Sequence, residues 1–257
     1  HPSNFFVSFA PDDSGNSIGA AIECYKLCGF QPSTINSEAL KNPFLSPETL
    51  KTRSYNLELV EILKSRSLNL QVKSFDSIDK YSETIAEIIN SNKVLGIHNG
   101  RMEFGQRALG NRSILASPVI VEMKDIINMK IKFRENFRPF AAIVFEEDAE
   151  DYFETNGQLS PYMERVFKVK EKYHKVIPAV VHPDGTCRIQ TIPKDNKSVM
   201  AKILLNLEKS IGVPIVINTS LNTNDQPIAY SISDTIDTFL RSGLDALAFG
   251  SDTILYK

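Results

Sequence analysis

Residues 94–97, Val-Leu-Gly-Ile, lead into Gly100-Arg101-Met102-Glu103-Phe104-Gly105-Gln106-Arg107-Ala108-Leu109-Gly110-Asn111-Arg112-Ser113, a stretch with three arginines and three glycines. The apolar run predicts a buried strand that ends in a loop. Glycine lets the backbone of this loop approach a ligand, and the planar donor fork of arginine fits phosphate or carboxylate oxygens. Because apolar residues at 108–109 and 114–115 bracket the charges, the pattern favours an anion pocket over a solvated loop with surface arginines.

On both sides of this stretch, segments with helical spacing alternate with short apolar runs, which predicts an α/β fold. The expected helices cover residues 77–92, about 122–133, 203–211 and 232–242. The expected strands cover residues 94–97, 177–182, 188–192, 215–217, 244–249 and 253–256. The turn residues Pro183-Asp184-Gly185 join the strands at 177–182 and 188–192, and the polar stretch 33–54 is expected to be a connector.

The composition is ordinary for a soluble globular protein, with 257 residues, 42% hydrophobic residues and a net charge of −2. No apolar run is long enough to span a membrane and no signal peptide is visible, so we expect a cytoplasmic protein without a membrane partner. Three sparse cysteines argue against a disulfide framework, and Cys24 and Cys28 are expected to be core thiols.

Charge is unevenly distributed along the chain. Residues 98–138 contain eight Lys and Arg against four Asp and Glu, although the whole chain is slightly acidic. A local basic cluster in an acidic chain fits a small anionic ligand better than a nucleic acid, so no nucleic-acid partner is expected. The sequence leaves the oligomeric state open.

A second cationic segment contains Lys132, Arg134 and Arg138, with Phe133, Phe137 and Phe140 between or beside them. The pattern suits a phosphate pocket with an aromatic stacking wall. Residues at i and i+2 of a helix point to different faces. If Lys132 and Arg134 contact one ligand, the chain must therefore be extended or ending a helix at this point. The alternative is an exposed helix end at which basic residues favour the helix dipole.

Two further segments place polar residues on or after expected strands. Residues 218–222, Asn-Thr-Ser-Leu-Asn, follow an apolar strand, and ligands of open α/β sheets bind at that end of a strand. The alternative for this segment is a polar turn or a helix cap. Arg188 and Gln190 share one strand face, where both need partners, and a ligand is one possibility.

The order and spacing of these segments, from about residue 94 to the end, resemble the C-terminal part of the O-carbamoyltransferases, the family of nodulation and antibiotic-tailoring carbamoyltransferases. Lys132-Phe133-Arg134 and Ser220-Leu221-Asn222 fit the Lys-x-Arg and Ser-x-Asn signature of its YrdC/Sua5-type domain. The resemblance implies a YrdC-like twisted mixed sheet with flanking helices over residues 51–257. It also implies that residues 1–50 are the tail of a Kae1-like (ASKHA) domain plus a connector.

The resemblance also implies roles for individual residues. In the family, carbamoyl phosphate and ATP, with Mg²⁺, form carbamoyladenylate, which is passed to a hydroxyl-bearing small molecule. The residues that match catalytic positions are Arg107, Lys132, Arg138, Arg188 and Ser220. The residues that match positions for the nucleotide or carbamoyl group are Arg101, Arg112, Arg134, Asn218, Thr219 and Asn222. Arg134 has an alternative role as the ion-pair partner of Glu135 or Glu103.

Residues 11–21 resemble the last strand, turn and helix of the Kae1-like domain, in which Asp13 matches a metal ligand. The family's His-x-x-x-His pair has no counterpart among the four histidines, so the implied transition-metal site, expected to hold iron in the full-length protein, is incomplete. Departures from the family pattern occur at His98-Asn99, Gln106, Ala142 and Leu221. Two alternative functions remain: a threonylcarbamoyl-AMP synthase of tRNA modification, which shares the signature, and a non-catalytic nucleotide-binding homologue.

Overall fold

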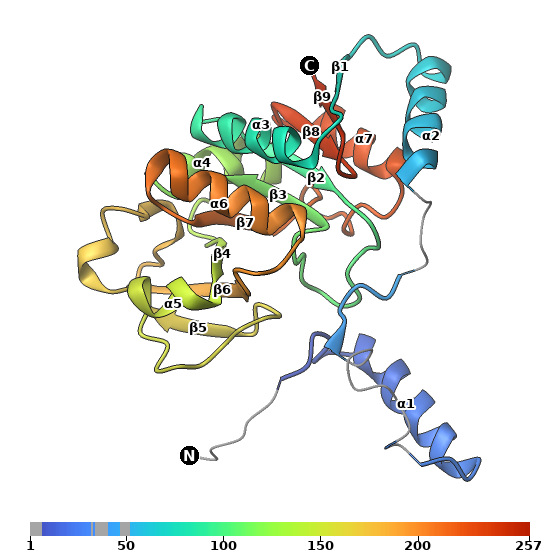
Figure 1. Cartoon of the computed structure of the whole chain (residues 1–257), viewed down its shortest axis with the longest axis vertical. Coiled ribbons are helices and arrows are strands. Elements are labelled where there is room, and N and C mark those ends of the chain that lie inside the picture. The colour runs from blue at the N-terminus through green and yellow to red at the C-terminus, as the bar shows by residue number, and fades with distance from the viewer. Residues whose placement is uncertain (1–6, 32, 34–40, 47–51) are drawn as a thin grey trace.

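The computed structural model describes residues 7–31, 33, 41–46 and 52–257 (Figure 1). The helices are α1 (Ser14–Leu27), α2 (Thr52–Ser65), α3 (Ile78–Asn90), α4 (Met123–Ile127), the π-helix η3 (Asn128–Lys132), α5 (Glu146–Tyr152), the 3₁₀ turns η4 (Glu171–Tyr173) and η5 (Pro178–Val180), α6 (Val199–Ile211) and α7 (Ile232–Arg241). The strands are β1 (Gln71–Ser74), β2 (Leu95–His98), β3 (Arg112–Ala116), β4 (Ala141–Phe145), β5 (Arg165–Lys168), β6 (Thr186–Ile192), β7 (Ile215–Ser220), β8 (Ala246–Phe249) and β9 (Thr253–Tyr256).

In the described residues the strands form one sheet in the order β1-β9-β8-β2-β3-β7-β4-β6-β5. The pairs β2–β8 and β4–β6 are parallel and the other pairs are antiparallel, so the sheet is mixed. α3 and α6 lie side by side on one face, over a core that includes Leu95, Leu115 and Val216 (Figure 1). A second core on the opposite face joins residues of α4 and α7 to alternate strand residues such as Ile114. The predicted α/β fold with a mixed sheet and flanking helices is confirmed.

The predicted helices are present because their sequences carry both an apolar face and helix caps. The Ser77 hydroxyl accepts from the backbone of Asp79 at the start of α3, and Ser198 caps α6 in the same way. α6 ends at Gly212, which adopts the left-handed conformation with a φ of 70°. α7 starts with a capping box between Ser231 and Asp234.

The predicted strand at residues 177–182 is wrong, because these residues form the turn η5 and its flanks. Pro178 has no backbone N–H to donate to a strand ladder, and Ala179 N–H bonds instead to the carbonyl of Pro118. The predicted turn at 183–185 is nevertheless present, since His182 N–H donates to Thr186 O at 2.7 Å.

The described residues before residue 47 pack against the sheet and its loops through a small cluster. Phe9 and Ala10 form a small cluster with Leu109, Ala141 and residues 162–163. None of the residues of α1 is buried, and Figure 1 shows this helix extending away from the sheet. Cys24 and Cys28 are therefore exposed, which corrects their prediction as core thiols. The expected connector, residues 33–54, lies largely outside the described residues, and the division of the chain at residue 50 stays a prediction.

Candidate functional site

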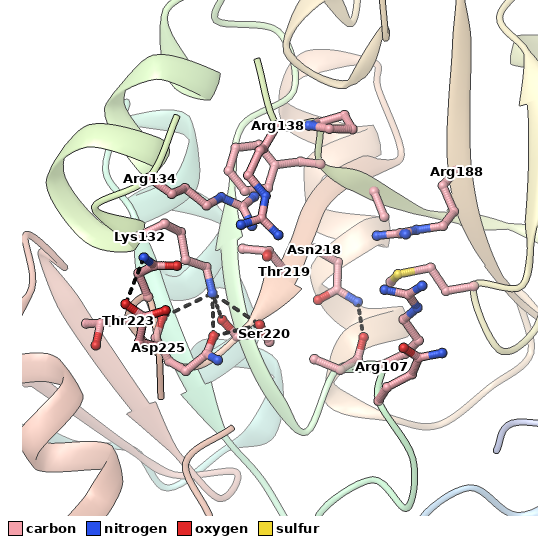
Figure 2. Close-up of a pocket in the computed structure, with 18 residues that line it drawn as sticks. Arg107, Lys132, Arg134, Arg138, Arg188, Asn218, Thr219, Ser220, Thr223 and Asp225 are labelled. Carbon is pink, nitrogen blue, oxygen red and sulfur yellow. Dashed lines mark hydrogen bonds between the residues drawn. The ribbon is translucent and has the colours of Figure 1, made fainter. Parts of the chain in front are cut away.

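A cavity of about 340 Å³ opens where β4, β6 and β7 begin or end, next to the loop before β3 that carries Arg107 (Figure 2). Five of its lining side chains are cationic and one is acidic. The lining residues are Gln106, Arg107, Ala108, Lys132, Arg134, Arg138, Pro139, Phe140, Ala141, Met163, Arg188, Asn218, Thr219, Ser220, Asn222, Thr223, Asn224 and Asp225. We call this cavity the cationic pocket. Eleven arginine, lysine, serine, threonine and asparagine residues are expected at the site from the sequence. Nine of them line the cationic pocket.

The sheet register explains why residues far apart in sequence meet in the pocket. Ala141 of β4 pairs with Arg188 of β6 on one side and with Asn218 of β7 on the other. These three residues therefore form one row across the sheet. Figure 2 shows Arg188 and Asn218 extending from their strands into the same cavity as Arg107.

Lys132 and Arg134 both face the pocket because the helix ends between them. Lys132 is the last residue of η3, and Phe133 adopts the left-handed conformation with a φ of 48°. This reversal of the backbone brings the side chains at i and i+2 to one cavity, which confirms that the helix ends here. The sequence-based expectation of a helix ending near residue 133 therefore has a structural cause.

Lys132 connects the Lys-x-Arg segment of the site to the Ser-x-Asn segment. The residue is 3% exposed, and its ammonium group donates to both the backbone carbonyl and the hydroxyl of Ser220. It also donates to the carbonyl of Asn222 at 3.0 Å and to Oδ1 of Asn222 at 2.6 Å (Figure 2). Burial, together with the charges of Arg134 and Arg138, lowers the pKa of Lys132 well below its ordinary value. The Lys-x-Arg and Ser-x-Asn segments are thus in direct contact.

Arg134 is fixed by neutral partners rather than by a carboxylate. Its Nε donates to Oδ1 of Asn128 at 2.7 Å, and its guanidinium lies 5.0 Å from the ring centroid of Phe140. Among the described residues Arg134 forms no ion pair with Glu103 or Glu135, so the alternative role as an ion-pair partner is not supported. Burial and the nearby Arg138 lower the pKa of Arg134 to about 10.

Arg107, Arg138 and Arg188 reach the pocket without a hydrogen-bond or ion-pair partner for their side chains among the described residues. Burial, reinforced by the charge of Arg107, lowers the pKa of Arg188 to about 10, and Nε of Arg188 is buried without a partner. Guanidinium groups held close together without counter-charges favour a bound anion, because anion oxygens would supply the missing acceptors.

Asn218 ties the loop before β3 to the sheet. Its Nδ2 donates to the carbonyl of Ala108 and to Oε1 of Gln190, both at 3.0 Å. Gln190 in turn donates to the carbonyl of Leu109 at 2.9 Å. Gln190 therefore finds its partners inside the protein, whereas Arg188 on the same strand faces the cavity. Oδ1 of Asn218 is buried without a hydrogen-bond partner.

Arg101 and Arg112, which match positions for the nucleotide or carbamoyl group, do not line the cationic pocket, and their binding role stays a prediction. Arg112 is fully buried, and its guanidinium donates to the backbone carbonyls of Asn99, Asn111 and Gly100. A buried guanidinium satisfied by carbonyls holds the loop in shape. Arg101 is exposed, and its own carbonyl accepts from the side chain of Asn111.

Glu103 is a residue that sequence reasoning missed as part of the site's framework. It is buried, and its Oε1 accepts from the backbone N–H groups of Leu109 at 2.7 Å, Asn111 at 2.8 Å and Arg112 at 3.2 Å. The carboxylate thereby closes the loop that carries Arg107. No feature of the sequence distinguishes this glutamate from a surface glutamate.

The structure offers different support for the two metals implied by the family resemblance. Asp13 lies at the start of α1, and the described residues contain no group of three or more His, Cys, Asp or Glu side chains suited to a metal. A transition-metal site therefore does not fit the described residues. Asp225 lies in the cationic pocket, where one carboxylate fits Mg²⁺ held mainly by the phosphates of a ligand.

No described helix is both long and apolar enough to cross a membrane.

Comparison with known proteins identifies relatives over nearly the whole chain. The family model "Carbamoyltransferase C-terminus" matches residues 86–256. Nodulation protein NolNO of Sinorhizobium fredii is 37% identical over 250 residues, which cover 96% of this chain and 35% of that protein. Nodulation protein NolO of Bradyrhizobium diazoefficiens is 37% identical over 249 residues, covering 96% and 44%. This chain thus spans less than half the length of both relatives.

Similarity to solved structures is weaker. Full-length HypF in its phosphate- and nucleotide-bound form has 15% identity and a TM-score of 0.41, covering 68% of this chain and 21% of HypF. A doubly substituted variant of Sua5 from P. abyssi has 11% identity and a TM-score of 0.46, covering 67% and 46%. These values are too low to support an argument about the site.

Proposed function

Because the chain belongs to the carbamoyltransferase family and carries its C-terminal domain, we propose that the cationic pocket binds carbamoyl phosphate and ATP and forms carbamoyladenylate. In the full-length protein, the carbamoyl group then passes to the hydroxyl group of a small-molecule acceptor. The chain itself supplies the first half of this chemistry.

The convergence of five cationic side chains on one cavity is the observation that carries the proposal. A single phosphate monoester would leave much of this positive charge without a counter-charge. Two phosphorylated ligands, one of them a triphosphate, bring enough negative charge to occupy them, and the cations in turn reduce the repulsion between the ligands. Arg107, Arg138 and Arg188 are the guanidinium groups with free donors for phosphate oxygens.

The proposed chemistry runs in three steps. Hydrolysis of carbamoyl phosphate releases phosphate and carbamate. A carbamate oxygen attacks the α-phosphorus of ATP, the bond to the bridging oxygen of the β-phosphate breaks, and pyrophosphate leaves. Later, an acceptor hydroxyl attacks the carbamoyl carbon, forming the carbamate ester and releasing AMP and the hydroxyl proton.

The residues of the chain contribute positioning and electrostatic stabilisation to these steps. The arginines hold the phosphates and offset the charge that develops on pyrophosphate as it leaves. Lys132 fixes the turn at Ser220 and Asn222, whose polar atoms then border the cavity. Mg²⁺ would neutralise phosphate charge when bound, and Asp225, which lines the cavity, would hold it.

Mass spectrometry of the nucleotide products tests the proposal. We expect carbamoyladenylate when the chain is incubated with ATP, Mg²⁺ and carbamoyl phosphate, and none when carbamoyl phosphate is omitted. A parallel incubation with threonine and bicarbonate distinguishes the alternative synthase, which would yield threonylcarbamoyladenylate instead. Absence of any adenylate in both incubations, while ATP still binds, would support a non-catalytic nucleotide-binding protein.

A further inference from the structure

Phe133 is an aromatic residue that adopts an energetically unfavourable backbone conformation, and it lies in the sequence between the two pocket cations Lys132 and Arg134. Its φ of 48° lies in the left-handed region, which a residue with a bulky side chain rarely adopts. Its side chain is exposed, with 54% of the residue accessible to solvent. The turn that brings Lys132 and Arg134 to the pocket thus leaves an aromatic ring at the surface beside them.

This ring lines a second hollow that adjoins the cationic pocket. The hollow has a volume of about 460 Å³ and is lined by Met129, Phe133, Arg134, Glu135 and Asn224. Arg134 and Asn224 also line the cationic pocket, so the two cavities share a wall. Met129 is 60% exposed, and it adds apolar surface to that of the ring. Exposed apolar side chains grouped next to a polar cavity are typical of a ligand-binding surface.

The cationic pocket itself offers no comparable surface to a nucleobase. Phe140 is the single aromatic residue among its described lining residues. The guanidinium of Arg134 covers that ring at 5.0 Å from its centroid, and Phe140 is almost fully buried. The pocket therefore provides charge for phosphates, while the adjoining hollow provides the free aromatic face.

We propose that the surface formed by Phe133 and Met129 is the stacking platform for the purine base of the nucleotide whose phosphates occupy the cationic pocket. This inference rests on the proposed function, since it places the base of the nucleotide that the function requires. Arg134, shared by the two cavities, lies between the phosphates and the base. Stacking of a base on an aromatic ring is favourable for any purine, so the platform selects for a nucleotide over a simple polyphosphate.

Three variants of Phe133 separate the contribution of the ring to ligand binding from that of the backbone turn. Asn tolerates the left-handed conformation but cannot stack, so Phe133→Asn removes the platform and keeps the turn. Phe133→Tyr keeps an aromatic face and serves as the matched control. Phe133→Gly also removes the ring but relieves the backbone strain, so its comparison with Phe133→Asn shows whether strain relief adds to the effect.

Calorimetric titration with ATP and with inorganic tripolyphosphate, which has the phosphates but no base, measures the effect. We expect Phe133→Asn and Phe133→Gly to bind ATP about 5- to 150-fold more weakly than the unmodified chain. Their affinity for tripolyphosphate should be unchanged, and Phe133→Tyr should bind both ligands as the unmodified chain does.

The outcomes distinguish this inference from the proposed function. If the unmodified chain binds ATP and Phe133→Asn binds it equally well, the platform is refuted while the proposed function stands. If Phe133→Asn loses affinity for ATP and tripolyphosphate alike, the ring supports the shape of the pocket and not the base, and the inference is again refuted. If the unmodified chain binds neither ligand, the proposed function fails and the platform with it.

Discussion

Lys132 is a buried lysine whose ammonium group contacts four oxygen atoms of a turn almost ninety residues further along the chain. The family resemblance identified both segments through its Lys-x-Arg and Ser-x-Asn signature. It did not show that the lysine would bond to the turn itself. Burial decides that outcome, because an ammonium group removed from water takes whatever acceptors the fold supplies.

The lowered pKa of Lys132 predicts a pH dependence with opposite signs for ligand binding and for folding. Bound polyphosphate favours the protonated lysine, so affinity for tripolyphosphate should fall as pH rises through this lowered pKa. The unfolded chain has an ordinary lysine and binds more protons in that range. Stability of the unliganded chain should therefore rise with pH over the same interval.

Titration calorimetry and thermal unfolding, at a series of pH values below the ordinary lysine pKa of about 10.4, measure the two trends. Lys132→Met should abolish the part of both trends that comes from this residue. Affinity and stability that change in the same direction, or that keep the same pH dependence in Lys132→Met, would contradict this assignment of the titrating group.

The arginines show that residue type alone does not predict which side chains face the pocket. Arg107 lies in the loop before β3 and Arg112 is the first residue of β3, and both were expected from the sequence to bind the ligand. The structure turns Arg107 to the cationic pocket and buries Arg112 among backbone carbonyls. The donor fork suits phosphate and carbonyl oxygens equally, so only the path of the backbone separates the two roles.

At the scale of elements, the sequence predicts a helix or strand correctly where features of that segment alone determine its structure. α3, α6 and α7 combine an apolar face with side-chain caps, and both features can be read from a single segment. β3 could not be recognised, because it begins at Arg112 inside a stretch that reads as a loop. The pairing of β3 with β2 and β7 determines this strand, and such pairing is not visible locally.

The loop between β2 and β3 depends on Glu103, which gives a prediction at this scale. Glu103→Ala should leave three buried or half-buried backbone N–H groups without their acceptor and lower the free energy of unfolding by about 2–4 kcal/mol. Because the same loop carries Arg107, affinity for ATP should fall as well. Glu103→Gln retains one acceptor oxygen and should restore most of both losses.

Chemical denaturation and calorimetry measure these effects, and Glu83→Ala on the exposed face of α3 is the control for loss of a glutamate. If Glu103→Ala proves as stable as Glu83→Ala and binds ATP equally well, the carboxylate does not organise the loop.

At the scale of the whole molecule, the chain covers 35% to 44% of the length of the nodulation proteins NolNO and NolO. The cationic pocket is built entirely from residues between Gln106 and Asp225. The metal site implied near Asp13 has no further ligands grouped around it in the described residues. We therefore expect the proposed first half-reaction to be separable from the second, because group transfer requires its complete set of positioned residues.

We expect this chain to release pyrophosphate from ATP in the presence of carbamoyl phosphate, without carbamoylating a hydroxyl acceptor. A coupled pyrophosphate assay follows the first reaction, and mass spectrometry of aminoglycoside and sugar acceptors follows the second. Efficient carbamoylation by this chain alone would place the acceptor site within the domain described here.

The central claim is that the cationic pocket binds the two phosphorylated substrates, and calorimetric titration of pocket variants tests it most directly. ATP and carbamoyl phosphate would each be titrated into the unmodified chain, Arg107→Ala, Lys132→Ala and Arg138→Ala. The control is Arg241→Ala, which removes an exposed arginine at the end of α7. Arg107→Ala and Arg138→Ala should each bind at least one ligand about 10- to 150-fold more weakly, because a lost charge-assisted phosphate contact costs roughly 1.5–3 kcal/mol. Lys132→Ala should also bind more weakly, because the turn at Ser220 and Asn222 loses its anchor, while the control should bind normally. Near-normal affinity for both ligands in all three pocket variants would contradict the claim.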